Sequence, residues 1–380
     1  TPHEDATVVA RLRRAGAVLL GKLQMTEDAY SDHHPAITPL RNPWNATCWT
    51  GISSSGPAVA TAAGLCFGSL ASDTGGSIRW PRGATGLTGI KPTWGHTSRF
   101  GVFELAASLD HVGPIARSAA DAALILAAIA GPDDNDPTAL AGPPPDYADA
   151  TRGDVGGLRL GVDAQWNSAD VDPVAQHVID EAERAFRGLG ADLVPVSAPD
   201  VTRGVMDWAA ACALEAALAH RATYPARKAE YGPVLASVLE TGHAVSALDY
   251  QAIRLRRMAL RGRLARLFRT IDTLLLPVQP FAPLGLDEIA DFGINPARVA
   301  KLQRYTAPFN LTGHPNVTLP VSCSLGLALL AQGCRHSDRQ KLGRPQAPLR
   351  RRGQEMAEKA RRVFLADGSV RQARSRGVDG

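Results

Sequence analysis

The sequence is poor in cysteine and has no long apolar run. Its five cysteines are an odd number, and none forms a Cys-x-x-Cys pair; they are Cys48, Cys66, Cys212, Cys323 and Cys334. A disulfide framework and a zinc site of that type are therefore not expected, and a reducing compartment fits. No apolar run reaches the roughly 18 residues that a membrane helix needs. We therefore predict a cytoplasmic protein with no membrane association, no cofactor and no metal.

Excess positive charge is confined to the C-terminal end. From Ala331 onward there are thirteen Lys and Arg residues against five Asp and Glu, whereas the whole chain has a net charge of only +4. The preceding residues are mildly acidic, so the basic net charge does not predict a nucleic-acid-binding body. We interpret residues 336–380 as a basic tail that is disordered or divergent.

One glycine- and serine-rich stretch, from Gly51 to Pro81, carries the strongest functional signal. Two turns, around Ser53 and Ser77, are separated by a run of small residues. Glycines let backbone N–H groups approach a ligand closely, and serines supply hydroxyls. The combination suits a nucleophile beside an oxyanion hole of main-chain donors.

Three other chemistries lack a required residue in this stretch. A phosphate-binding P-loop needs Lys followed by Ser or Thr after the glycines, and none follows. A nucleophile elbow needs Gly-x-Ser-x-Gly, which neither serine satisfies. An aspartic protease needs a second Asp-Thr/Ser-Gly besides the one at Asp73, and there is none.

Helix and strand signals alternate along the chain, which is typical of an α/β protein. We expect helices over residues 5–16, 57–65, 118–130, 173–189 and 247–270. We expect strands over 17–20, 66–70, 158–162, 192–196, 273–278 and 317–321, with 326–332 as a further candidate. Ser118 and Asp121 form a capping box at the start of one helix. Residues 132–157 form a loop.

Several motifs in a fixed order resemble those of the amidase signature family. They are Gly51-Ile52-Ser53-Ser54-Ser55-Gly56, Ser72-Asp73-Thr74-Gly75-Gly76-Ser77-Ile78-Arg79 and Gly86-Leu87-Thr88-Gly89-Ile90-Lys91-Pro92-Thr93, supported by Leu109-Asp110-His111-Val112-Gly113-Pro114 and Phe309-Asn310-Leu311-Thr312-Gly313-His314-Pro315. The resemblance implies one α/β/α domain over residues 1–335, built around a mixed central β-sheet.

The resemblance also implies cleavage of a carboxamide through an acyl-enzyme, by a Ser–cisSer–Lys triad. Ser77 matches the nucleophile, and Ser53 matches the bridging serine, which follows a cis peptide bond in the family. The other implied members are backbone N–H groups for the oxyanion (Thr74, Gly75, Gly76) and loop-supporting side chains (Asp73, Arg79, Ser54).

The lysine of the triad has no match in this sequence. In the family it lies on a strand that precedes the segment matched by residues 5–22, so we expect an N-terminally truncated domain that lacks this lysine. Lys22 belongs to a further matched pair, Gly21-Lys22, and Lys91 belongs to Ile90-Lys91-Pro92-Thr93; we interpret both as non-catalytic. Ile52, Ser55 and Pro57 also depart from the family's glycine loop.

The remaining candidates are four histidines and a tryptophan. His111 and His314 lie within matched motifs, and we interpret them as core residues. His33, His34 and Trp49 either line a substrate pocket or lie on the surface.

Three functional hypotheses follow from the sequence. The first is an amidase acting on a small-molecule amide, with a homodimer as one expected assembly. The second is a tRNA-dependent amidotransferase component, the A subunit of that enzyme, which would work with partner subunits. The third is an inactive fragment or pseudoenzyme that keeps the fold.

Overall fold

The computed structural model describes residues 4–331 apart from 152, 282–283, 291–294 and 323–324. The chain divides into two units: the first comprises Thr1–Thr151 and Val155–Gly333, and the second comprises Arg152–Asp154 and Cys334–Gly380. The helices and strands named below belong to the first unit, and the expected tail over 336–380 lies outside the described residues. No helix in the described part is long and apolar enough to span a membrane.

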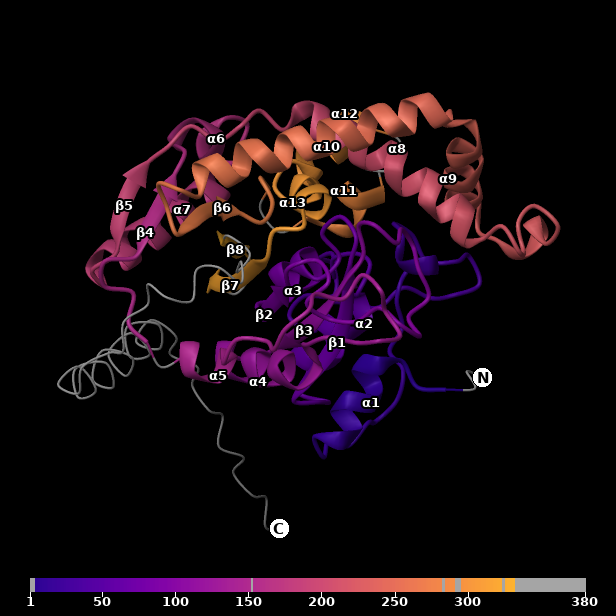
Figure 1. Cartoon of the computed structure of the whole chain (residues 1–380), viewed down its shortest axis with the longest axis horizontal. Coiled ribbons are helices and arrows are strands. Elements are labelled where there is room, and N and C mark those ends of the chain that lie inside the picture. Colours follow the sequence, from indigo (N-terminus) through magenta and orange to yellow (C-terminus); the bar gives the residue numbers. More distant parts are fainter. Residues whose placement is uncertain (1–3, 152, 282–283, 291–294, 323–324, 332–380) are drawn as a thin grey trace, which may run out of the picture. The chain divides into compact units, whose positions relative to one another are not determined.

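Eight strands form one mixed sheet in the order β1-β3-β2-β7-β8-β6-β4-β5 (Figure 1). They are β1 (Gly68–Asp73), β2 (Thr88–Lys91), β3 (His111–Ala116), β4 (Arg159–Val162), β5 (Asp192–Pro195), β6 (Thr273–Pro277), β7 (Asn316–Ser322) and β8 (Leu325–Ala331). In this spatial order, each strand from β1 through β3, β2, β7 and β8 to β6 pairs antiparallel with the next. The strand β4 pairs parallel with both β6 and β5.

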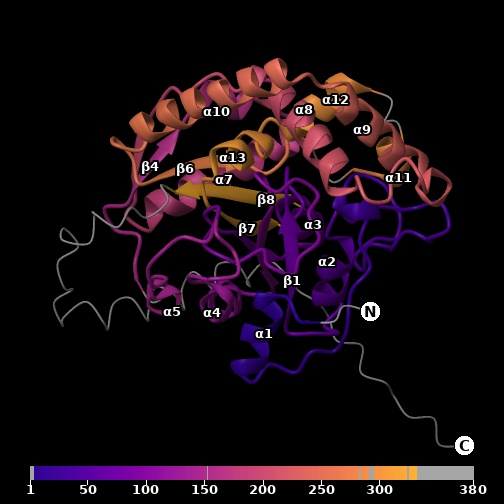
Figure 2. The same ribbon diagram turned by 45° about the vertical axis from the view of Figure 1, so that its right-hand side comes forward.

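The helices are α1 (Thr7–Arg14), α2 (Ser55–Ala62), α3 (Arg79–Thr85), α4 (Ala119–Ile129), α5 (Tyr147–Ala150), α6 (Ala164–Ser168), α7 (Pro173–Gly188), α8 (Thr202–Ala219), α9 (Pro233–Ala244), α10 (Ala247–Leu267), α11 (Leu286–Ala290), α12 (Pro296–Gln303) and α13 (Ala307–Thr312). Figures 1 and 2 both show α8, α9 and α10 lying together, away from α1 and α4.

Alternating side chains on the strands place helices on both faces of the sheet. On β3, Val112 and Ala116 pack with α1 and α4, whereas Ile115 packs with Ala58 of α2. The same alternation occurs on β6, where Leu275 packs with α7. Its neighbours Leu274 and Leu276 pack instead with α10 and α13. The fold is therefore the predicted α/β/α sandwich around a mixed sheet.

The helix that begins after Ser118 shows how local sequence specifies an element. The Ser118 hydroxyl accepts a hydrogen bond from the Asp121 N–H at 3.0 Å and donates to its carboxylate at 2.7 Å. These bonds satisfy an N–H group that has no partner in the first helical turn. Ser118 is therefore confirmed as the N-cap, whereas the Asp121 carboxylate binds the Ser118 hydroxyl and not the Ser118 N–H of a full capping box.

The expected strand over residues 17–20 is wrong. These residues form no strand, and Val18 and Leu20 are 84% and 73% exposed. A strand requires a hydrogen-bonded neighbour, and an apolar run alone cannot supply one.

Smaller differences concern the bounds of three other elements. The strand expected over 66–70 is β1 at Gly68–Asp73, the helix expected over 57–65 is α2 at Ser55–Ala62, and the loop over 132–157 contains the short helix α5.

Candidate active site

Two loops that are separate in the sequence run alongside each other at the end of β1. Ser54 Oγ donates to the Ser72 carbonyl at 3.2 Å and accepts from the Ser72 N–H at 3.3 Å. At the other end, a Cβ on Gly51 would lie 2.2 Å from Pro81 Cα. Only glycine therefore permits this approach, and Gly51 also has a φ of +78°. The segment that contains Ser53 consequently lies against the segment that contains Ser77.

Ser53 lies in the first of these two packed segments. The Ile52–Ser53 peptide bond is cis, as the family resemblance implies. The carbonyl of Ser53 accepts a hydrogen bond from the Thr26 N–H at 3.2 Å. Its side chain is fully buried, and its hydroxyl has no hydrogen-bond partner among the described residues.

Ser77 lies in the turn between β1 and α3. The residue is largely buried, and its side chain forms no hydrogen bond within the described part of the chain. The turn is held by Asp73, whose carboxylate accepts the N–H of Ile78 at 3.1 Å. The nucleophile candidate therefore sits on a segment whose backbone is fixed by the last residue of β1.

A buried ion pair joins Asp73 to Arg79. The Arg79 Nε and Nη2 atoms donate to the two carboxylate oxygens at 2.9 and 2.8 Å, and both side chains have no exposed surface. Asn310 Nδ2 of α13 donates to the carboxylate and to the backbone carbonyl of Asp73, at 2.9 Å each. Burial alone would raise the pKa of Asp73, but the Arg79 guanidinium holds that pKa well below its usual range.

The backbone from Thr74 to Gly76 follows this ion pair. The N–H groups of Thr74, Gly75 and Gly76 donate to no acceptor among the described residues. A Cβ on Gly75 would lie 2.3 Å from Cζ2 of Trp208, so a larger residue would collide with the indole. Gly76 has a φ of +147°, a conformation that residues with a side chain rarely adopt. The segment thus presents free donors on a backbone that requires glycine at positions 75 and 76.

Within the described part of the chain, neither lysine of the matched motifs forms a hydrogen bond with Ser53 or Ser77. Lys22 lies on the exposed segment after α1. Lys91, at the end of β2, is fully buried, and its Nζ donates to the His314 carbonyl at 2.6 Å. Burial and the neighbouring Arg79 charge place the pKa of Lys91 well below its usual value. Lys91 therefore connects β2 to the segment after α13.

Both histidines of the matched motifs are buried. His111 Nδ1 lies 2.7 Å from the Leu109 carbonyl, and its Nε2 has no partner among the described residues. His314 Nδ1 lies 2.9 Å from Thr312 Oγ1. Burial lowers the pKa of both rings, that of His314 to about 4. Both are therefore neutral at pH 7.

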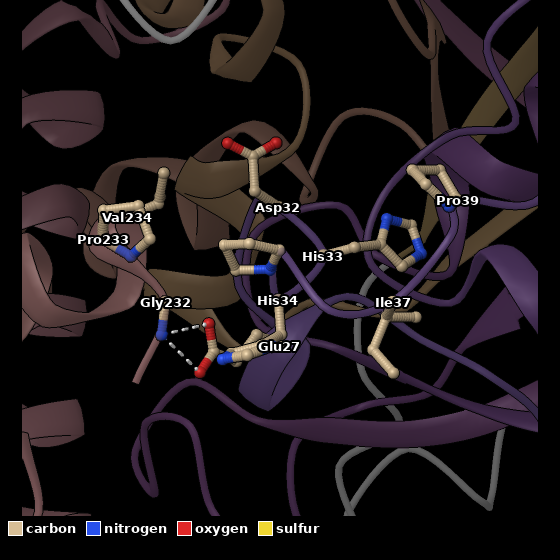
Figure 3. A pocket seen from close by; sticks show the side chains of 10 residues that line it. Glu27, Asp32, His33, His34, Ile37, Pro39, Gly232, Pro233 and Val234 are labelled. Carbon is tan, nitrogen blue, oxygen red and sulfur yellow. Dashed lines mark hydrogen bonds between the residues drawn. The ribbon is translucent and has the colours of Figure 1, made fainter. Parts of the chain in front are cut away.

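The two histidines of the loop before Asn42 line a pocket of about 390 Å³ (Figure 3). Its wall includes His33, His34 and Glu27, whose carboxylate accepts the Gly232 N–H at 3.0 and 3.1 Å. Ser53 and Ser77 are not among the lining residues. Trp49, by contrast, is buried in a cluster with Trp80 and is not a surface residue.

Sequence reasoning assigned no role to three residues that hold the Thr74–Gly76 segment. Trp208 Nε1 donates to the Thr74 carbonyl at 2.7 Å, Asp110 accepts from the Thr74 hydroxyl at 2.5 Å, and Asn310 binds Asp73. Asp110 and Asn310 lie within matched motifs, so their place in these motifs could have identified them as candidates. Trp208 lies in α8 and belongs to no motif, so only the packing of this helix identifies it.

Comparisons with known proteins agree with this architecture. Residues 1–340 match the family model described as Amidase. The chain is 48% identical over 320 residues to the Mycobacterium bovis protein named "Putative amidase AmiD", and the match covers 84% of this chain and 67% of that protein. It is 36% identical over 362 residues to the A subunit of the glutamyl-tRNA(Gln) amidotransferase from Geobacter metallireducens, covering 87% and 74%.

Among solved structures, one similar chain comes from a vestigial protein complex connected with the origins of an s-triazine catabolic enzyme. The two chains are 30% identical with a TM-score of 0.80, and the match covers 94% of this chain and 78% of the other. The similarity thus extends over the sheet and the helices on both of its faces.

Proposed function

Because the chain belongs to the amidase family, whose members cleave amides, we propose that Ser77 is its nucleophile and that Ser53 relays the proton of Ser77. The observation that supports this proposal is the packing of the Ser53 segment against the Ser77 segment, in which the Ser53 hydroxyl is fully buried without a hydrogen-bond partner among the described residues. Leaving such a group unsatisfied costs about 1–3 kcal/mol. A proton relay is a physical reason for retaining it.

The chemistry follows from the arrangement of the two loops. Ser77 Oγ attacks the carbonyl carbon of the amide and passes its proton to Ser53, which passes its own to a base. The N–H groups of Thr74, Gly75 and Gly76 hold the oxyanion, and each such donor is typically worth roughly 3–4 kcal/mol in the barrier. The amine leaves with a proton returned through Ser53. Water then hydrolyses the ester on Ser77.

The base in this proposal is neither Lys22 nor Lys91. Lys22 is exposed, and Lys91 donates to the His314 carbonyl. The family resemblance assigns the role to a lysine on a strand that the 380 residues do not match.

The test combines turnover of aryl and aliphatic amides with covalent labelling by a fluorophosphonate, which reacts with activated serines. Ser77→Ala is expected to abolish both signals, and Ser53→Ala to lower them by about 10²–10⁴-fold. Ser55→Ala is the matched control, because the Ser55 hydroxyl is also buried without a partner among the described residues. It should leave both signals near those of the unmodified chain.

Two outcomes would overturn the proposal for this chain. One is turnover or labelling that survives Ser77→Ala. The other is an unmodified chain that neither turns over any amide nor reacts with the probe, which would favour the inactive-fragment hypothesis. Equal losses in Ser53→Ala and Ser55→Ala would argue that loop packing, and not a relay, is responsible.

A second candidate is the A component of an amidotransferase, favoured by the 36% identity with the Geobacter metallireducens protein. That role requires partner subunits and glutamine as the source of ammonia. Glutamine-dependent ammonia release by a stable complex purified from the native host would favour it. Release of ammonia from simple amides by the isolated chain would favour a stand-alone amidase.

A further inference from the structure

Thr74 is held from two sides. Its hydroxyl donates to Asp110 Oδ1 at 2.5 Å, and its carbonyl accepts from Trp208 Nε1 at 2.7 Å. The residue is buried, so neither bond competes with water. The indole of Trp208 also lies against Gly75. The bond to the Thr74 carbonyl fixes the plane of the Thr74–Gly75 peptide, which carries the free N–H of Gly75.

The carboxylate that holds Thr74 is itself attached to a rigid support. Asp110 Oδ2 accepts the N–H groups of Leu105 and Ala106 at 3.0 Å each. In the same loop, the Ser108 N–H and hydroxyl donate to Glu215 of α8 at 2.8 and 2.6 Å.

The opposite side of this loop is held by α10. Arg257 donates to the Ser108 hydroxyl at 2.7 Å and to its carbonyl at 2.6 Å. The loop over 105–110 is thus anchored to two helices. Because the loop that carries Asp110 is anchored, a change in the Asp110–Thr74 bond should move Thr74 and not Asp110.

Protonation of Asp110 would change this bond. Oδ2 already accepts two N–H groups, so a proton is accommodated on Oδ1, which faces the Thr74 hydroxyl. The protonated carboxyl would become the donor, and the Thr74 hydroxyl would have to turn its hydrogen toward another acceptor. The contact between the two side chains reverses direction.

The surroundings of Asp110 allow this change near neutral pH. Burial raises its pKa to about 7, against the lowering effects of the Thr74 hydroxyl, the Ala106 N–H and the Arg99 charge. The charge of Glu215 raises it further. Cys212 also faces this region, and burial raises its pKa well above the usual value, so its thiol stays uncharged.

We propose that Asp110 is a positioning residue for the Thr74–Gly76 backbone, and that proton uptake by Asp110 reverses its bond to Thr74 and loosens that backbone. The consequence for catalysis rests on the proposed role of these N–H groups as the oxyanion hole. The proton-dependent contact itself is a property of the folded chain and does not depend on turnover.

The test follows the indole N–H resonance of Trp208 by ¹⁵N NMR in the full chain labelled at tryptophan. The chain has six tryptophans, and Trp208→Phe identifies the resonance. We expect it to shift with a midpoint near pH 7 as pH is varied between about 5.5 and 8.5. Asp110→Asn should remove this titration.

The matched control is Asp136→Asn. Asp136 is also a buried carboxylate that accepts two N–H groups and a threonine hydroxyl, from Arg99 and Thr138. Because these bonds lower its pKa against the effect of burial, it does not titrate in this range. The Trp208 resonance should titrate normally in this variant.

A second variant keeps the proposal testable should Asp110→Asn fail to fold. Thr74→Val removes the hydroxyl that lowers the pKa of Asp110, so the midpoint should move to higher pH. A Trp208 resonance that does not titrate, that titrates equally in Asp110→Asn, or whose midpoint is unchanged in Thr74→Val would overturn the proposal. Loss of activity in Ser77→Ala bears only on the proposed function.

If the protein turns over an amide, the same mechanism predicts that kcat and KM respond differently to loss of the Asp110 carboxylate. Loosening the oxyanion donors affects the transition state more than the bound substrate. Asp110→Asn should therefore lower kcat with little change in KM, and the fall in kcat below about pH 7 should disappear.

Discussion

Replacing Asp73 with asparagine is expected to lower the free energy of unfolding by about 3–5 kcal/mol, the range for removing one partner of a buried ion pair. Its carboxylate accepts four hydrogen bonds, two from Arg79 and one each from the Ile78 N–H and Asn310 Nδ2. An asparagine amide would turn an NH₂ group toward some of these donors. It would also leave the Arg79 guanidinium buried without its counter-charge.

A second buried basic group also interacts with the Asp73 carboxylate. Lys91 is fully buried, and its interaction with Asp73 acts to raise the lysine's pKa. Removing the carboxylate therefore removes the favourable partner of two buried basic groups. A large fraction of the roughly 5–15 kcal/mol that is typical of a folded domain would be lost.

Urea unfolding followed by circular dichroism measures the change, with the free energy extrapolated to water. The matched control is Asp272→Asn, which makes the same substitution in the Arg159–Asp272 pair. That pair is 2.6 Å long, but its side chains are 43% and 41% exposed. Solvent screens such pairs, so the control should lose much less.

A double variant separates the ion pair from general damage. In Asp73→Asn/Arg79→Met the stranded cation is removed, so its loss should be smaller than the sum of the two single losses. The reasoning would be refuted by equal losses in Asp73→Asn and Asp272→Asn. Strict additivity in the double variant would refute it as well.

Two further predictions concern residues around this cluster. Gly75→Ala should cost about 1–3 kcal/mol and displace the Trp208 indole, because the new Cβ would lie 2.3 Å from Cζ2; calorimetry can compare it with Gly188→Ala, where nothing lies within 4 Å, and equal Tm values would contradict it. His314 has a pKa of about 4 in the fold against 6.5 in the unfolded chain, so the unfolded chain takes up the proton first and stability falls as pH drops from about 6.5 to 4. This loss amounts to roughly 3 kcal/mol and should shrink in His314→Gln, as urea unfolding at several pH values can show; an unchanged pH dependence would contradict it.

Local patterns predicted many elements because the interactions that form them span only a few residues. The N-cap at Ser118 is a case in which neighbouring residues carry the physical reason, because the Asp121 N–H that it accepts lies only three positions away. The motif order was likewise sufficient to predict the α/β/α sandwich. The prediction of a strand over 17–20 was wrong because a strand needs a neighbouring strand to pair with, and an apolar run does not indicate whether one is present.

The sequence by itself determined the family, the sandwich fold and the segment that holds the two serines, because these follow from short motifs and from alternating apolar patterns. Only the tertiary structure decided which distant residues form hydrogen bonds with that segment. Trp208 lies 134 positions from Thr74 along the chain, and Asn310 lies 237 positions from Asp73. Such contacts arise only when α8 and α13 pack beside the end of β1, and burial there removes the water that would otherwise compete for the same donors and acceptors.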